Sequence, residues 1–121
     1  MKKSERSFLH ILEDIVASIS KILHYTDSFN LEKFKNDDKT VDAVIRNLEI
    51  TGEASNKIPP NIRDKYSEVP WDEMYRMRNK AIHEYFGIDY DIIWDIVSNY
   101  LPENLIQIKK ILEIESRKKP D

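Results

Sequence analysis

Residues 74–88 read Met-Tyr-Arg-Met-Arg-Asn-Lys-Ala-Ile-His-Glu-Tyr-Phe-Gly-Ile. The stretch predicts the last turns of a helix that runs into a turn at Gly87. It brings together Arg78, His83 and Tyr85, which supply a permanent cation, a proton carrier and a phenol. No other part of the sequence concentrates reactive side chains in this way, so this stretch is the first candidate for a functional site.

These residue types suit the cleavage of RNA without a metal ion. The ribose 2′-hydroxyl must lose a proton to attack the neighbouring phosphorus, and histidine is a good general base or acid near neutral pH. The pentavalent phosphorane carries extra negative charge, for which arginine supplies a planar fork. We therefore take Arg78 and His83 as candidate catalytic residues.

Two further residues of the stretch are candidates for supporting roles. Asn79 lies four residues before His83 and would share its helix face, where it could orient the imidazole or bind a phosphate oxygen. Tyr85 lies just beyond, where the helix should be ending, so its hydroxyl is expected to be accessible. No metal and no cofactor is expected.

The spacing Arg-x4-His is not specific by itself. An arginine in an ion pair with an acidic neighbour, followed by a histidine that caps the end of the helix, would produce the same pattern. Glu49 and Glu53, one turn apart in an earlier helix, could resemble a pair of metal ligands. Because no His or Asp has matching spacing, we interpret them as a solvated acidic edge.

The rest of the sequence predicts an all-α fold. Apolar residues recur at steps of three and four over residues 4 to about 25, 38 or 40 to about 57, 71 into the motif, and 90 to about 116. Short helices could form near 31–35 and 61–66. Pro102 should kink the last helix. The two glycines of the chain are too few for the turns of an all-β fold.

Composition limits the classes of protein to consider. A length of 121 residues suits one domain, 1–121, and 40% apolar with 34% charged residues indicates a soluble globular chain. The absence of cysteine excludes disulfides and is compatible with the cytoplasm. No stretch approaches the roughly 18 apolar residues of a membrane span, and the acidic residues near the start argue against a signal peptide. With a net charge of −3, any contact with RNA must be local.

The predicted helix over residues 38–57 is apolar on two sides. One face carries Val41, Val44 and Leu48, and a neighbouring face carries Ala43, Asn47, Ile50 and Ala54. A helix apolar on more than one side is covered on more than one side, which suggests a second subunit. In a two-fold dimer, two Arg-His pairs would meet in one cleft, and one histidine could act as base and the other as acid.

The segment from Arg78 to Tyr85 resembles the Arg-x4-His-x-Tyr signature of the HepT-like toxins of the HEPN superfamily. The segments 47–58, 69–79, 89–97 and 101–102 also resemble blocks of this family, so the resemblance covers nearly the whole chain. It implies a HEPN-type antiparallel bundle of four to five helices that forms a homodimer. It also implies a metal-independent ribonuclease toxin of a type VII toxin–antitoxin system, with Arg78 and His83 in a cleft at the dimer interface.

The same resemblance implies a protein partner, an MntA-type nucleotidyltransferase antitoxin that transfers AMP from ATP to Tyr85. An adenylate there would add negative charge and bulk where the RNA phosphate must bind, and so silence the nuclease. The alternative is a non-catalytic, nucleotide- or substrate-binding subunit of a nucleotidyltransferase complex, in which Arg78 grips a triphosphate.

Overall fold

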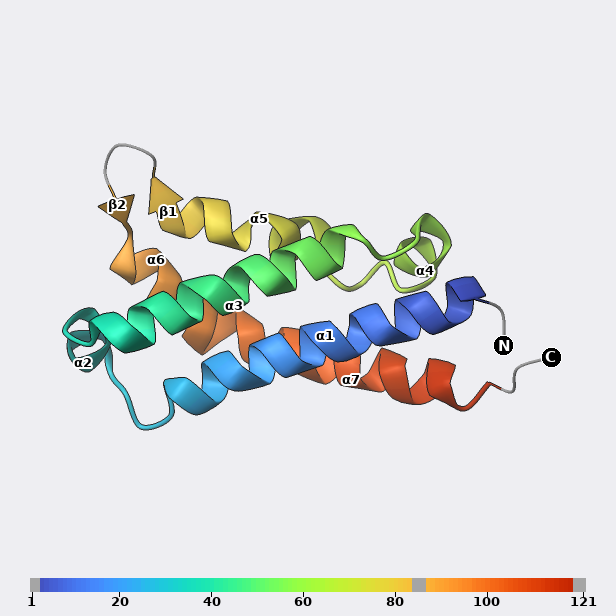
Figure 1. Cartoon of the computed structure of the whole chain (residues 1–121), viewed down its shortest axis with the longest axis horizontal. Coiled ribbons are helices and arrows are strands. Elements are labelled where there is room, and N and C mark those ends of the chain that lie inside the picture. The colour runs from blue at the N-terminus through green and yellow to red at the C-terminus, as the bar shows by residue number, and fades with distance from the viewer. Residues whose placement is uncertain (1–2, 84–86, 119–121) are drawn as a thin grey trace.

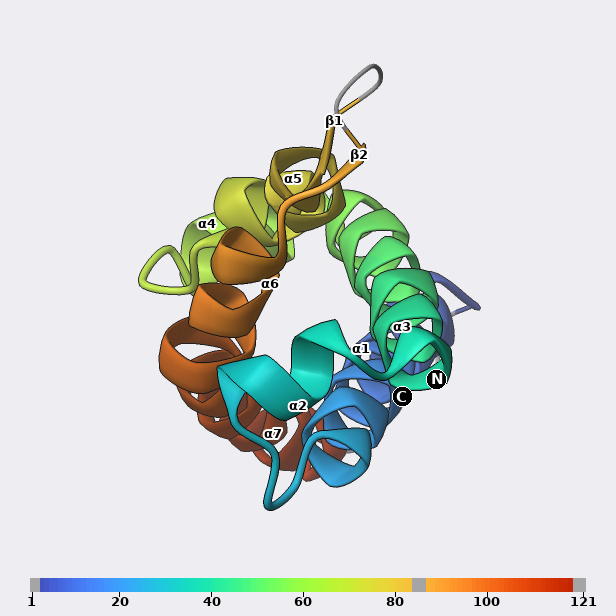
Figure 2. The same ribbon diagram turned by 90° about the vertical axis from the view of Figure 1, so that its left-hand side faces the viewer.

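Four helical runs that alternate in direction form the body of the protein in the computed structural model, which describes residues 3–83 and 87–118. Figure 1 shows each run returning antiparallel to the one before it, and the end-on view in Figure 2 shows the runs around a common core. The prediction of an all-α antiparallel bundle is confirmed. The runs are α1 (Lys3–Tyr25), α3 (Asp38–Asn56), α5 (Trp71–Ala81), and α6 (Tyr90–Asp95) continuing through a π-helical segment (Ile96–Tyr100) into α7 (Leu101–Ser116).

Shorter elements close the two ends of the bundle. At one end lies α2 (Leu31–Lys35), whose buried Phe34 packs against the rings of Tyr90 and Trp94, with centroids 6.5 and 5.4 Å away. The same end carries a small antiparallel ladder of β1 (Ile82–His83) and β2 (Gly87–Ile88) (Figure 1). The helix α4 (Pro60–Lys65) lies toward the opposite end.

The predicted apolar stripes form the core. Steps of three and four place side chains on one face of a helix, and each buried Leu or Ile contributes roughly 1.5–3 kcal/mol relative to exposure. The buried stripe residues of the two helices that flank α3 are Phe8, Leu12, Ile15, Ile19 and Ile22 in α1, and Trp71, Met74, Met77 and Ala81 in α5.

None of the helices in the described part of the chain combines the length and apolar composition needed to cross a membrane.

The helix α3 is covered on both sides within a single chain. It packs between α1 and α5, and the Ser18 hydroxyl of α1 lies 2.7 Å from that of Thr51. Asn47 and Ala54, which belong to its second face, are each only 7% exposed. The packing of the single chain therefore accounts for much of both apolar faces, and the dimer stays a prediction.

The last helix is interrupted directly before Pro102, as the sequence predicts. Proline has no N–H and cannot continue the helical ladder. The chain adjusts by forming the π-helical segment Ile96–Tyr100, in which the Leu101 N–H donates to the Ile96 carbonyl. A π-helical turn widens the ladder by one residue, so it changes the rotational register of α7 relative to α6.

A buried carboxylate joins the region of α4 to the end of α7. Glu115, 6% exposed, accepts hydrogen bonds from Tyr66 Oη and from Lys65 Nζ at 2.9 Å, and Lys118 Nζ lies 3.3 Å away. Burial raises the pKa of Glu115, but the hydrogen bonds from Tyr66, Lys65 and Lys118 outweigh it and hold that pKa below its ordinary value. The folded state therefore favours the ionised carboxylate.

We expect Glu115→Gln to lower the free energy of unfolding by about 1–3 kcal/mol at neutral pH, because it weakens charge-assisted hydrogen bonds. A carboxyl whose pKa is lowered on folding stabilises the protein above its unfolded pKa and loses that contribution as pH falls through its folded value. The difference between wild type and variant should therefore shrink as the solution is acidified below pH 4.5, the ordinary pKa of the group. Urea unfolding across this pH range measures it.

The control is Glu113→Gln, which removes an equal charge from the same helix. Glu113 is exposed and pairs with the exposed Arg117 one turn on. Exposed pairs contribute roughly 0–1 kcal/mol, so this variant should remain close to wild type. An equal loss of stability in both variants would contradict the assigned role of Glu115.

Candidate active site

Arg78 lies on α5 at the boundary between core and solvent. Met74, Met77 and Ala81 are buried on the inner face of the helix. Arg78, the residue after Met77, lies at the edge of this face and is partly exposed. Its side chain is 41% exposed, yet its Nε atom is fully buried. The guanidinium therefore has a covered inner edge and an open outer edge.

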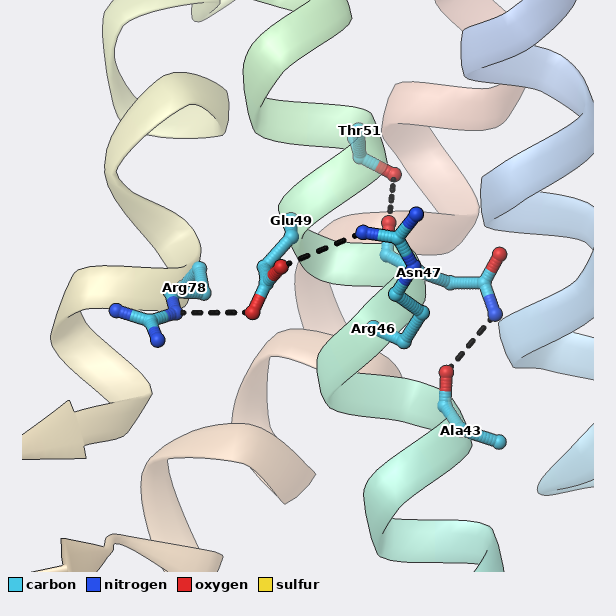
Figure 3. Close-up of polar contacts among 6 residues, drawn as sticks. All are labelled: Ala43, Arg46, Asn47, Glu49, Thr51 and Arg78. Atoms are coloured by element: carbon cyan, nitrogen blue, oxygen red, sulfur yellow. Dashed lines mark hydrogen bonds and ion pairs between the residues drawn. The ribbon is translucent and has the colours of Figure 1, made fainter.

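One ion pair connects Arg78 to Glu49 of α3, and a second ion pair joins Glu49 to Arg46 of the same helix (Figure 3). Arg78 Nε lies 3.4 Å from Glu49 Oε1, and Arg46 Nη1 lies 3.5 Å from Glu49 Oε2. The interpretation of Glu49 as a solvated acidic edge is wrong, because its carboxylate is shared between two arginines. Glu53, one turn on, is exposed as expected.

A glycine allows the two helices to approach closely enough for this contact. A Cβ placed on Gly52 would lie 2.9 Å from the Tyr75 carbonyl oxygen of α5, a distance that real side chains do not tolerate. Because α3 and α5 are antiparallel, Glu49 and Arg78 lie one turn away from this crossing on the same side. The crossing therefore sets the distance between the carboxylate and the guanidinium.

A surface groove of about 320 Å³ runs along the same crossing. Arg78 and Asn79 line it from α5, and Asn79 is exposed, as a phosphate-binding residue needs to be. Tyr75 is 43% exposed at the groove and presents an aromatic ring. The remaining lining residues are Leu48, Glu49, Gly52 and Glu53.

His83 does not lie on the helix, contrary to the prediction. The helix α5 ends at Ala81, Ile82 is extended with φ −117° and ψ 121°, and His83 belongs to β1. The chain turns back through Gly87, whose φ of +80° suits glycine, and pairs with His83. Asn79 and His83 therefore do not share a helix face, because residue 83 is not helical.

The β ladder places a carboxylate beside His83. Asp89 N–H donates to the Ala81 carbonyl at 2.8 Å, which fixes Asp89 opposite the end of α5. Asp89 Oδ2 then lies 3.6 Å from His83 Nε2, and its other oxygen accepts from the Ile92 N–H at 3.1 Å. Asp89 is thus the N-cap of α6, and nothing in the spacing of the sequence indicated its contact with His83.

Each candidate catalytic residue thus has its own carboxylate. Arg78 pairs with Glu49 and His83 pairs with Asp89, while no hydrogen bond or ion pair joins Arg78 to His83 in the part of the chain that the structure describes. Within the same residues no group of three His, Asp or Glu could hold a metal ion. Tyr85, the predicted site of modification, lies outside the described residues.

The carboxylates beside Arg78 and His83 bear on what these two side chains can do chemically. Asp89 Oδ2 lies close enough to His83 Nε2, at 3.6 Å, to form an ion pair with the imidazole when the ring carries a proton. The imidazole is 46% exposed, so it can reach a substrate. Arg78 offers its outer nitrogens to an anion. His83 can therefore move a proton, and Arg78 can stabilise negative charge.

Comparison with known proteins identifies the family. The model of the family described as "Ribonuclease HepT-like" matches residues 15–111. A Methanocaldococcus jannaschii protein named "Putative RNase MJ0127" is 44% identical over 93% of this chain and 90% of its own length. A Thermococcus cleftensis protein named "Probable ribonuclease HepT" is 45% identical over 84% of this chain and 90% of its own. No solved structure matches. The chain belongs to the HepT-like ribonuclease family.

Proposed function

We propose that this protein is a metal-independent endoribonuclease, in which His83 transfers protons and Arg78 stabilises the phosphorane. The observation that carries the proposal is the open outer edge of the Arg78 guanidinium at a surface groove, followed five residues later by an accessible His83 beside Asp89. Relatives that are named as ribonucleases align with most of this chain, and they support the same function.

The reaction follows from these groups. One base removes the proton of a ribose 2′-hydroxyl, and the 2′-oxygen attacks the adjacent phosphorus. The bond from phosphorus to the 5′-oxygen breaks, and an acid protonates that oxygen as it leaves. The products are a 2′,3′-cyclic phosphate and a 5′-hydroxyl. His83 takes the part of base or acid, and Arg78 holds the phosphorane oxygens, since its charge is worth most where negative charge develops.

Single-stranded RNA is the substrate class that the groove fits best. Tyr75 offers a ring on which a base can stack, and such stacking contributes roughly 1–3 kcal/mol per base. Asn79 adds a polar group for a phosphate oxygen. A net charge of −3 gives the chain no overall attraction for RNA, so binding depends on these local contacts.

We further propose that two copies of the chain share one cleft. The motif supplies one histidine per chain, whereas the reaction needs both a base and an acid, and a two-fold axis would supply two. Activity per chain should then fall on dilution, in parallel with the appearance of monomer in size-exclusion chromatography with light scattering. A fully active monomer would contradict this part of the proposal.

The cellular role proposed is that of a toxin controlled by modification of Tyr85. A nucleotidyltransferase antitoxin would catalyse attack of the Tyr85 hydroxyl on the α-phosphorus of ATP, with loss of the phenolic proton and release of pyrophosphate. Tyr85 lies two residues after His83 in the sequence, so the adenylate would bring negative charge close to the site. Intact mass of the protein co-expressed with such an enzyme, compared with Tyr85→Phe, tests it.

The experiment that tests the nuclease incubates the purified chain with RNA in the presence of a chelator. We expect cleavage to persist and the new ends to be 2′,3′-cyclic phosphates and 5′-hydroxyls. A folded chain that cuts no RNA at any salt concentration would overturn the proposal. Tight binding of ATP by such an inactive chain would instead support a nucleotide-binding subunit.

A further inference from the structure

We propose that Glu49 is a positioning residue, which holds the inner edge of the Arg78 guanidinium so that its outer edge faces the scissile phosphate. The inference rests on the proposed ribonuclease activity. It assigns a role to a residue of α3 that lies outside the Arg-x4-His-x-Tyr motif.

The first argument is the geometry of the guanidinium. Arg78 Nε is fully buried and lies 3.4 Å from Glu49 Oε1, while the side chain as a whole is 41% exposed. Figure 3 shows the two outer nitrogens of Arg78 pointing away from Glu49. A planar guanidinium can use separate edges for separate partners, so the contact with Glu49 leaves the outer edge free for a bidentate contact with phosphate.

The second argument is the charge of the cluster. A lone carboxylate beside Arg78 would cancel the charge that the phosphate needs. Here Arg46 Nη1 lies 3.5 Å from the other oxygen of Glu49, so the three side chains together carry one net positive charge. Arg46 therefore offsets the charge of Glu49, and the site keeps a cation while gaining a fixed orientation for it.

The third argument is the rigidity of the support. Glu49 lies one turn before Gly52, where the backbone of α5 comes too close to α3 for a Cβ atom. A carboxylate on a packed helix holds its partner better than one on a loop, because its own backbone cannot move. Arg78 Nε is buried and makes no hydrogen bond to the described residues, and its distance of 3.4 Å from Glu49 Oε1 is longer than the roughly 2.7–2.9 Å of a charge-assisted hydrogen bond. The two groups are therefore held together by charge as an ion pair.

The test compares Glu49→Gln and Glu49→Ala with wild type in steady-state cleavage of single-stranded RNA. We expect kcat to fall about 10-fold for Gln and about 100-fold for Ala, with KM nearly unchanged, because a small misplacement of a group that acts in the transition state can cost about 10²-fold. The control is Asp42→Asn, which removes one charge from an exposed position of α3 and should leave kcat and KM unchanged. An increase in kcat or in RNA affinity for the Glu49 variants would show that Glu49 blocks Arg78, and would overturn the proposal.

A second measurement does not depend on activity. The side-chain Nε–H signal of Arg78, assigned by its loss in Arg78→Lys, reports the motion of the guanidinium by ¹⁵N relaxation. We expect a high order parameter in wild type and in Asp42→Asn, and a clear drop in both Glu49 variants. An unchanged order parameter would overturn the positioning role. If wild type cuts no RNA, the proposed function fails, while this measurement still decides whether Glu49 holds Arg78.

Discussion

His83→Ala will slow RNA cleavage by about 10²- to 10⁴-fold, the contribution expected of a positioned general acid or base. The side chain is 46% exposed and contacts Asp89 at 3.6 Å, so its removal leaves the core intact. The free energy of unfolding should change by no more than about 0.5 kcal/mol, as for other surface substitutions. Product formation from a labelled RNA and a thermal melt of the same sample separate the two effects.

A histidine elsewhere on the surface supplies the control. His24 is exposed in the last turn of α1, and His24→Ala should cleave RNA at the wild-type rate. Asp89→Asn should give an intermediate rate, because the imidazole remains but loses the charged partner that lies 3.6 Å from it. If His83→Ala keeps the wild-type rate, the proton passes through another group and the assignment is wrong.

Gly52→Val will reduce both stability and activity. The new side chain would meet the Tyr75 carbonyl oxygen, since a Cβ alone would already lie 2.9 Å from it. Overpacking of this kind costs typically about 1–3 kcal/mol, and relief requires α3 and α5 to separate. Separation moves Glu49 away from Arg78, so RNA cleavage by the folded fraction should also fall. Urea unfolding and cleavage at a temperature well below the melting point measure the two.

The neighbouring substitution Glu53→Val separates the steric effect from helix propensity. It introduces the same β-branched residue into the same helix, but at an exposed position. We expect a loss of at most about 0.7 kcal/mol from helix propensity. Gly52→Ala is informative as well, because alanine favours a helix over glycine by about 1 kcal/mol. A stabilised Gly52→Ala variant would show that separating the two helices costs less than the gain of about 1 kcal/mol in helix propensity.

The buried face of the motif helix could be predicted from the sequence, because it is a property of local spacing. Met74, Met77 and Ala81 follow steps of three and four, and all three are buried. The end of the same helix was predicted too late. Sequence reasoning extended it to His83, whereas pairing of the strand with Gly87 ends it at Ala81. A competing strand partner leaves no mark on helical periodicity.

The sequence by itself determined the helical segments and their buried faces, and it made Arg78 and His83 the candidate catalytic residues, because side-chain chemistry and apolar spacing are local. Only the tertiary structure decided which carboxylate each of them meets. Glu49 reaches Arg78 because α3 and α5 cross at Gly52, and Asp89 reaches His83 because the chain folds back at Gly87. Contacts between separate elements depend on how those elements pack, and packing distance is not encoded in the spacing of either element alone.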